Sequence, residues 1–233
     1  MSSNAERFLA AFNTIEQTLK KQLQLHRHYS FIKVVDIAKK RNPIVEKFEG
    51  DLKKYAELRN AIVHERVDPG FIIAEPHSEV VEDIEFIGKE LTKPKKVIPS
   101  FACKVATFHV NDPLMVVLDI INQRLYTQFP IYDHQGFYGL LTESGIAKWL
   151  ANQLVECPNL MDVRLLDVMA FEKHINHVIF VSQNENLYEV KEHFVRQMDM
   201  KMTRLHAVLI TESGDRNDPL LGIITPHDVI RFE

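Results

Sequence analysis

The chain has 233 residues, of which 45% are hydrophobic and 26% charged, a composition typical of a globular protein with one or two domains. It contains no apolar run near the roughly 20 residues of a membrane-spanning helix and no secretory core at its start, so we expect a cytoplasmic protein. The formal net charge of −4 argues against capture of nucleic acid by the whole surface. The cysteines, Cys103 and Cys157, have neither the spacing of metal ligands nor the density of a disulfide scaffold.

The first part of the chain predicts a bundle of four helices. Apolar residues recur at steps of three and four within Asn4–Leu25, which is the stripe of an amphipathic helix. Ser30 is a favourable cap for a second helix, and Asn42 followed by Pro43 is a favourable start for a long third helix. Ser78 is expected to cap a fourth helix.

One charged residue lies on the apolar stripe of the third helix. Continuing the steps of three and four from Tyr55 to Ile62 passes through Arg59, so a guanidinium stands where a core or interface residue is expected. Such a charge needs a partner or a function. Asn60 and His64 are four residues apart and share a helix face, which Arg59 reaches because its side chain is long.

Charge is divided unevenly in this part of the chain. The first 41 residues hold eight Lys and Arg against three acids, whereas Glu75–Glu90 holds six acids and one Lys. This division fits either a basic edge or an ordinary solvated surface. Thr92–Lys96 then has the composition of a stiff, charged linker. We place the helical bundle at residues 1–92 and the linker at 93–99.

After the linker, one order of elements occurs twice: strand, helix, strand, strand, helix. Each copy ends with an apolar strand that stops at a hydroxyl residue and opens a helix, first in Gly139–Thr142 and then in Gly222–Thr225. The expected elements are 105–110, 114–124, 129–132, 138–141 and 144–154 in the first copy, and 178–181, 187–197, 207–210, 221–224 and 226–231 in the second. This agreement along the chain indicates an internal repeat.

The second helix start has residues that suit a nucleotide. Thr225 is at the cap position, Pro226 at the first helical position and Asp228 at the third. Unpaired backbone N–H groups at a helix start attract an anion, and the Thr hydroxyl can join them. A carboxylate can also accept both protons of a vicinal diol, so the segment can hold a phosphate and a ribose. The alternative is that these residues only cap a helix.

The two copies resemble the cystathionine β-synthase (CBS) domain, and their tandem arrangement resembles a Bateman module. The residues that carry the resemblance are Phe129–Asp133, Gly139–Thr142, Asp167–Met169, Ala207–Ile210 and Gly222–Asp228. It covers about residues 97–233, and we place the repeats at 100–157 and 158–233. It implies a pseudo-two-fold pair of β-α-β-β-α units that bind adenosine-containing ligands such as AMP, ATP or S-adenosylmethionine in clefts and often form dimers. We therefore expect an α+β chain, with a helical bundle followed by this pair.

The resemblance implies roles for residues at the two helix starts. Thr225 matches the family's phosphate-contacting hydroxyl, and Asp228 matches its ribose-binding acid. Thr142 matches the hydroxyl in the first repeat, but the acid position there is Gly145, which cannot accept hydroxyl hydrogens. We therefore expect one competent site for an adenine nucleotide, near Thr225 and Asp228, and a second that is altered or empty.

The same resemblance implies two further contacts with the ligand. Backbone groups at the entry of the second repeat, at His177 and Val178, are expected to contact the base. Arg204 is a candidate phosphate partner, with a solvated surface role as the alternative.

Arg59–His64 resembles the mark of the HEPN superfamily, in which four to six residues separate an Arg from a following His, often with a polar residue after the Arg. The resemblance implies metal-independent RNA cleavage at an interface between two HEPN units. His64 would move the proton of a ribose hydroxyl, Arg59 would stabilise charge on the phosphorane, and Asn60 would orient the phosphate or His64. Alternatively, Arg59 pairs with an acid and His64 interacts with the end of its helix, in a binding scaffold.

Three hypotheses remain open from the sequence. The leading one is a regulatory homodimer that senses AMP, ADP or ATP through its CBS pair and transmits occupancy to the helical domain. The second is a HEPN endoribonuclease gated by that nucleotide, and the third is a structural dimerisation module whose clefts bind nothing. No metal is expected, since His26 and His28 are two residues apart and point to different faces of a helix.

Overall fold

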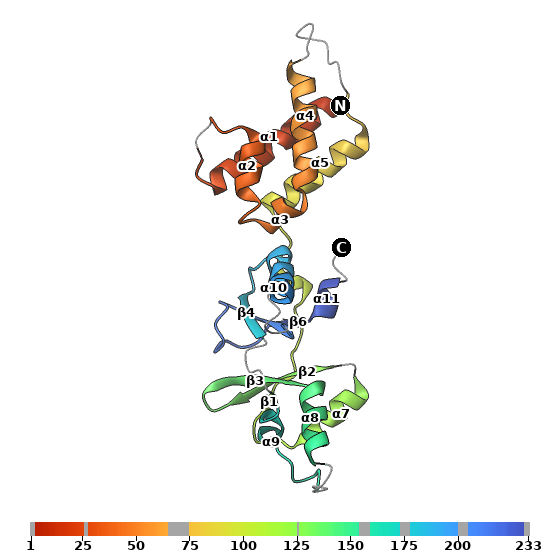
Figure 1. Ribbon diagram of the computed structural model, residues 1–233, viewed down its shortest axis with the longest axis vertical. Coiled ribbons are helices and arrows are strands. Elements are labelled where there is room, and N and C mark those ends of the chain that lie inside the picture. Colours follow the sequence, from red (N-terminus) through yellow and green to blue (C-terminus); the bar gives the residue numbers. More distant parts are fainter. Residues whose placement is uncertain are drawn as a thin grey trace. The chain divides into compact units, whose positions relative to one another are not determined.

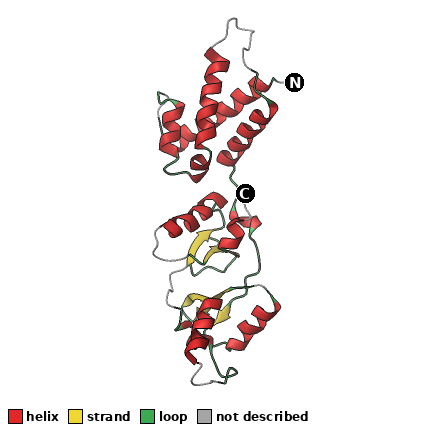
Figure 2. Cartoon of the chain, turned by 45° about the vertical axis from the view of Figure 1, so that its right-hand side comes forward, coloured by secondary structure: helices red, strands yellow, loops and turns green. Residues whose placement is uncertain are grey.

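The computed structural model of the chain (Figure 1) describes residues 3–25, 28–64, 75–124, 126–153, 159–172, 178–199 and 205–230. The chain divides into a unit of residues 1–95 with 186–189 and a unit of residues 96–185 with 190–233. Helices make up the described elements of the first unit, and the strands lie in the second (Figure 2). The α+β fold class, with a helical bundle before a pair of small sheets, is confirmed.

The first helix, α1 (Asn4–Gln22), begins at a capping box. Ser3 Oγ accepts a hydrogen bond from the backbone N–H of Glu6, and the Glu6 carboxylate accepts one from the backbone N–H of Ser3. The buried face of α1 carries Ala5, Phe8, Phe12, Ile15 and Leu19. The predicted amphipathic helix is therefore confirmed.

The next two helices, α2 (Phe31–Ala38) and α3 (Pro43–Lys47), begin at the predicted caps. Ser30 Oγ accepts from the N–H of Lys33 at 3.4 Å, and Asn42 Oδ1 accepts from the N–H of Ile44 at 3.0 Å. Each cap satisfies a backbone donor that has no partner within its helix.

The predicted third helix consists of two helices. α3 ends before Phe48, whose backbone leaves the helical region with φ −103° and ψ 14°, and α4 (Glu49–His64) follows. The Phe48 ring packs edge-on against Phe86, with 6.2 Å between the ring centroids. Tertiary packing overrides the local helical pattern at this residue, so the prediction of one continuous helix is wrong there.

The cap predicted for the last helix of the bundle is also wrong by one residue. α5 (Ser78–Thr92) has His77 at its N-cap, and Ser78 is already helical. Ser78 Oγ instead accepts a long hydrogen bond from Asn4 Nδ2, at 3.4 Å. The buried side of α5 includes Ile84 and Ile87 and packs against α1.

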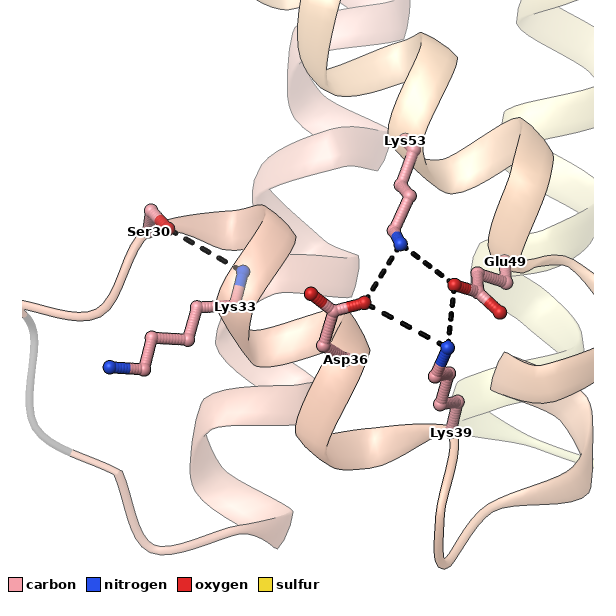
Figure 3. A network of polar contacts seen from close by, with 6 residues as sticks. All are labelled: Ser30, Lys33, Asp36, Lys39, Glu49 and Lys53. Carbon is pink, nitrogen blue, oxygen red and sulfur yellow. Dashed lines mark hydrogen bonds and ion pairs between the residues drawn. The ribbon is translucent and has the colours of Figure 1, made fainter.

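Four charged side chains tie α2 to α4 (Figure 3). Glu49 Oε1 lies 2.8 Å from Lys39 Nζ and 2.7 Å from Lys53 Nζ, and Lys53 Nζ lies 2.8 Å from Asp36 Oδ1. The hydrogen bond from Lys39, followed by that from Lys53, lowers the pKa of Glu49, and the hydrogen bond to Asp36 raises the pKa of Lys53. We call this cluster the α2–α4 ion network.

The division between the two units falls at Lys95–Lys96, and the sequence placed the linker at 93–99. α5 ends at Thr92, and a short helix, α6 (Val97–Ser100), lies within the predicted linker. The predicted boundary between the repeats, at 157–158, lies outside the described residues. The domain limits therefore stay predictions.

The second unit holds the same topology twice. The first copy consists of β1 (Phe108–His109), α7 (Leu114–Gln123), β2 (Gln128–Asp133), β3 (Gly136–Thr142) and α8 (Glu143–Gln153). The second consists of β4 (Val178–Ser182), α10 (Leu187–Asp199), β5 (Ala207–Thr211), β6 (Gly222–Ile224) and α11 (Pro226–Ile230). In each sheet the first pair of strands is parallel and the second pair antiparallel. The predicted repeat of β-α-β-β-α units is confirmed, with β1 shorter than predicted.

Each repeat is preceded by a short helix that packs on the other repeat. α9 (Leu165–Met169) precedes the second repeat, yet the Leu165 N–H donates to the Asp112 carbonyl of the first at 3.0 Å. α6 precedes the first repeat, yet the Val97 N–H donates to the Glu185 carbonyl of the second at 2.9 Å. This exchange brings residues that follow α9 close to the first repeat.

A small core joins the two sheets. Phe137 and Leu140 of β3 pack with Ala207 and Leu209 of β5. From the loop between β5 and β6, Arg216 Nη2 donates to the Phe137 carbonyl at 2.5 Å. The repeats are therefore held face to face through apolar contacts and this hydrogen bond. In the described part of the chain, no helix has the length and apolar character needed to cross a membrane.

Candidate functional site

In the second repeat, the predicted hydroxyl and acid contact each other. β6 ends at Ile224 and α11 begins at Pro226 (Figure 1), which leaves Thr225 between them. The N–H and the hydroxyl of Thr225 both donate to Asp228 Oδ2, at 2.8 and 2.7 Å. Both residues are half-buried. The structure describes no donor to the other carboxylate oxygen, Oδ1, which remains able to accept hydroxyl hydrogens.

In the first repeat, an acid from another segment contacts the matching threonine. The N–H and the hydroxyl of Thr142 both donate to Glu172 Oε1, at 2.7 and 2.8 Å. Thr142 is buried, with 6% of its surface exposed, and its Oγ1 also accepts from the N–H of Gly145 at 3.1 Å. Glu172 follows α9, the helix that packs on the first repeat, and is half-buried.

Gly145 leaves the space that this acid occupies. A Cβ atom at residue 145 would overlap Oε1 and Cδ of Glu172. Any larger residue here would therefore displace the Glu172 carboxylate from Thr142. Sequence reasoning identified the absent acid but missed its replacement, because Glu172 lies 30 residues from Thr142 and outside any fixed motif spacing.

The remaining predicted ligand contacts are described only in part. Val178 is the first residue of β4, is half-buried and pairs with Ala207 of β5. His177 and Arg204 lie outside the described residues. Their proposed contacts with a base and a phosphate therefore stay predictions.

The structure brings together two of the three residues that resemble the HEPN mark. Arg59 Nη1 donates to Asn60 Oδ1 at 3.4 Å on α4, with Arg59 half-buried and Asn60 exposed. His64 is the last residue of α4, and its side chain lies outside the described part of the chain. Nearby on α4, burial, followed by the charges of Asp83 and Asp51, raises the pKa of Tyr55 to about 12.

The helical unit also contains a buried acid that sequence reasoning missed. Glu90 of α5 is only 3% exposed, and Tyr188, from the 186–189 segment of this unit, is hydrogen-bonded to it. Burial, followed by this hydrogen bond, raises the pKa of Tyr188 to about 12. Lys47 Nζ lies 5.4 Å from the centre of the Tyr188 ring. The only signal in the sequence was an acid beside the apolar stripe of α5.

Comparison with protein families decides the nature of the repeats. Residues 100–152 and 172–233 each match the model of the CBS domain. The chain carries a tandem pair of CBS domains. The second match begins at Glu172, the residue whose carboxylate reaches back to the first repeat.

Three solved structures are similar to part of the chain. A putative acetoin utilization protein from Vibrio cholerae has 17% identity over 59% of this chain and 88% of its own, with a TM-score of 0.43. A CBS domain protein of unknown function from Thermoplasma acidophilum has 18% identity over 60% of this chain and 70% of its own, with a TM-score of 0.44. The CBS pair of protein MJ0100, solved with 5′-methylthioadenosine and S-adenosyl-L-methionine, has 21% identity over 60% of this chain and 95% of its own, with a TM-score of 0.41. No curated protein matches the sequence.

Within the described ranges, no group of three or more His, Cys, Asp or Glu residues is placed to hold a metal ion. The carboxylates of Glu172 and Asp228 each face a threonine instead. Chemistry at these two positions is therefore hydrogen bonding to hydroxyl and amide groups.

Proposed function

We propose that the chain is a cytoplasmic regulatory homodimer whose CBS pair senses an adenosine-containing ligand, with AMP, ADP and ATP as the first candidates. The observation that carries the proposal is the Thr225–Asp228 pair at the start of α11, in which one carboxylate oxygen is occupied and the other lacks a described donor. A ribose diol requires such an acceptor, since a carboxylate accepts hydrogen bonds but donates none.

Each group at this position has a distinct task in the proposal. Asp228 accepts the ribose hydroxyls, and the Thr225 hydroxyl rotates from Asp228 toward the phosphate. Backbone groups at His177 and Val178 contact the base, and Arg204 pairs with the phosphate. At Thr225 and Asp228, the ligand would thus replace water at groups that the folded chain already holds in position.

Occupancy is transmitted to the helical unit if the ligand binds one conformation of the chain more tightly than another. The size of the effect is limited by the difference in affinity between the conformations. The chain passes between the units at residues 95–96, 185–186 and 189–190, so a change within the CBS pair has several covalent routes to the helical unit.

The experiment is calorimetric titration of the full chain with AMP, ADP, ATP and S-adenosylmethionine, for wild type and Asp228→Asn. The substitution keeps the shape of the side chain but removes its charge, so we expect affinity to fall about tenfold or more. Asp218→Asn is the matched control, because Asp218 also accepts from the N–H and hydroxyl of one residue, Ser213, in the same repeat. Binding that is absent in wild type, or unchanged in Asp228→Asn, would contradict the proposal.

A second candidate function is metal-independent RNA cleavage by the helical unit. Its support is that Arg59 and Asn60, two residues of the HEPN-like run, share a hydrogen bond on α4 at 3.4 Å. The test is cleavage of single-stranded RNA in the presence of a chelator. Arg59→Ala and His64→Ala should each abolish cleavage, while Lys54→Ala, which changes an exposed cation on the same helix, should not. Activity that survives both substitutions would exclude these residues.

The third candidate is a dimerisation module that binds no ligand. It predicts a dimer by light scattering together with no calorimetric signal for any of the four compounds. A ligand-dependent signal that requires Asp228 would exclude it.

A further inference from the structure

The two CBS repeats contain the same arrangement of hydrogen bonds. In each, the N–H and the hydroxyl of one threonine donate to a single carboxylate oxygen, at 2.7 and 2.8 Å for Thr142 and at 2.8 and 2.7 Å for Thr225. Thr142 is the last residue of β3 and Thr225 follows β6, and each threonine precedes a helix. The two sites therefore match in chemistry as well as in position within the repeat.

The carboxylates come from different places in the chain. Asp228 belongs to the helix that follows Thr225, whereas Glu172 reaches Thr142 from the segment after α9. The Glu172 carboxylate can occupy this place only if residue 145 is glycine, because a Cβ atom at 145 would overlap it. The acid of the first repeat therefore comes from a different place in the chain than the acid of the second.

Capping of α8 alone does not account for Glu172. Thr142 Oγ1 already accepts the N–H of Gly145 at 3.1 Å, which is the usual bond of a threonine cap. Adding a half-buried carboxylate costs desolvation free energy. The Glu172 carboxylate makes the same pair of hydrogen bonds to a threonine that Asp228 makes in the second repeat. The structure describes no donor to the second carboxylate oxygen of Glu172, Oε2.

We propose that Glu172 supplies the missing acid of the first repeat, so that this repeat binds the ribose of a second adenosine-containing ligand. The inference rests on the proposed function of Thr225 and Asp228 and extends it from one ligand per chain to two. Glu172 Oε2 accepts the ribose hydroxyls, while Oε1 stays bonded to Thr142 and holds the carboxylate in place.

The test counts ligands per chain by calorimetry of the full-length protein, with AMP and adenosine as probes. Wild type should bind two molecules of a probe. Asp228→Asn and Glu172→Gln should each weaken one of the two sites by about tenfold or more, and the double variant should lose both. Glutamine retains an oxygen that can accept from Thr142, so the fold of the repeat should be preserved, which thermal unfolding checks.

A restored site provides a second test. In Gly145→Asp combined with Glu172→Ala, the acid returns to the position that it has in the second repeat, so the second ligand should be regained. Binding of one molecule to wild type, abolished by Asp228→Asn and unaffected by Glu172→Gln, would overturn the inference and leave the proposed function standing. No binding of AMP, adenosine, ADP, ATP or S-adenosylmethionine, or binding unaffected by both substitutions, would overturn the proposed function and the inference with it.

Discussion

The two CBS repeats reach the same contact by different routes. The second repeat takes its threonine and its acid from the start of one helix, while the first joins Thr142 to Glu172 across 30 residues. The exchange of α6 and α9 between the repeats makes the second route available, because it carries the chain after α9 to the first repeat. Acids at different positions in the sequence can thus make the same contact with a threonine.

The repeats also differ at their first helix. The Leu114 N–H at the start of α7 donates to the Val163 carbonyl, within the second unit. In the second repeat, the corresponding Leu187 N–H donates to the Lys95 carbonyl, and residues 186–189 belong to the helical unit. Tyr188 is thereby part of the environment of the buried Glu90. The second repeat is consequently the one that contributes residues to the helical bundle.

The largest effect is expected when the first repeat is given the acid of the second. Gly145→Asp places a Cβ atom and a second carboxylate where the end of the Glu172 side chain lies, so Glu172 must move away from Thr142, and overpacking and like charge should destabilise the chain by up to about 3 kcal/mol. Urea unfolding can be followed by the fluorescence of Trp149, the one tryptophan of the chain, which is 3% exposed on α8.

Two variants separate the local clash from a general effect of the substitution. Glu172→Ala should rescue Gly145→Asp, giving a non-additive pair. Gly50→Asp should change the free energy of unfolding by under about 0.5 kcal/mol, because a Cβ atom at Gly50 meets nothing within 4 Å. Equal destabilisation by both glycine substitutions would contradict the proposed overlap.

A smaller effect is expected at the first helix of the second repeat. Tyr188→Phe removes the hydroxyl that binds Glu90 and leaves a carboxylate that is 3% exposed without it, at a cost of about 2 kcal/mol. Thermal unfolding followed by circular dichroism measures the loss. Tyr126→Phe is the control, since Tyr126 is 45% exposed and water can replace its bond to Arg124.

The same tyrosine predicts a dependence on alkaline pH. The pKa of Tyr188 is raised from 10.0 to about 12, so the folded state retains this proton at a pH at which the unfolded state releases it. Its contribution is therefore present below about pH 10 and is lost as pH rises toward 12. Tyr188→Phe should have a shallower loss of melting temperature over this range than wild type. If melting temperature falls equally with pH in wild type and in Tyr188→Phe, Tyr188 does not cause this pH dependence.

The sequence predicted the repeat well because its signals are local. The caps at Ser30 and Asn42 and the strand order of both repeats depend on residues close together in the chain. The break at Phe48 and the contact between Thr142 and Glu172 depend on neighbours from other elements, which periodicity does not contain. Gly145 was the one local clue to the first site, and it indicated the loss of an acid without indicating its source.

The two threonines should differ in what their hydroxyls contribute. Thr142→Val removes a buried hydroxyl that serves both Glu172 and Gly145, which should cost about 1 to 2 kcal/mol. Thr225→Val should cost less than about 1 kcal/mol, because Thr225 is half-buried and water can reach Asp228. Urea unfolding with Trp149 fluorescence measures both. A greater loss of unfolding free energy in Thr225→Val than in Thr142→Val would contradict the expectation that the Thr142 hydroxyl contributes more.

The smallest effect is expected in the α2–α4 ion network, which serves as a reference because its four residues belong to the helical unit. Glu49→Gln removes the carboxylate that Lys39 and Lys53 share, and exposed ion pairs contribute little, so the melting temperature should fall less than in the variants above. Glu57→Gln, which changes an exposed acid on the same helix, is the control.

Because the pKa of Glu49 is lowered from 4.5, the contribution of Glu49 to stability is present above that value and is lost as pH falls through the lowered pKa. Wild type and Glu49→Gln should therefore converge in melting temperature in acid, and a gap that widens there would contradict the network.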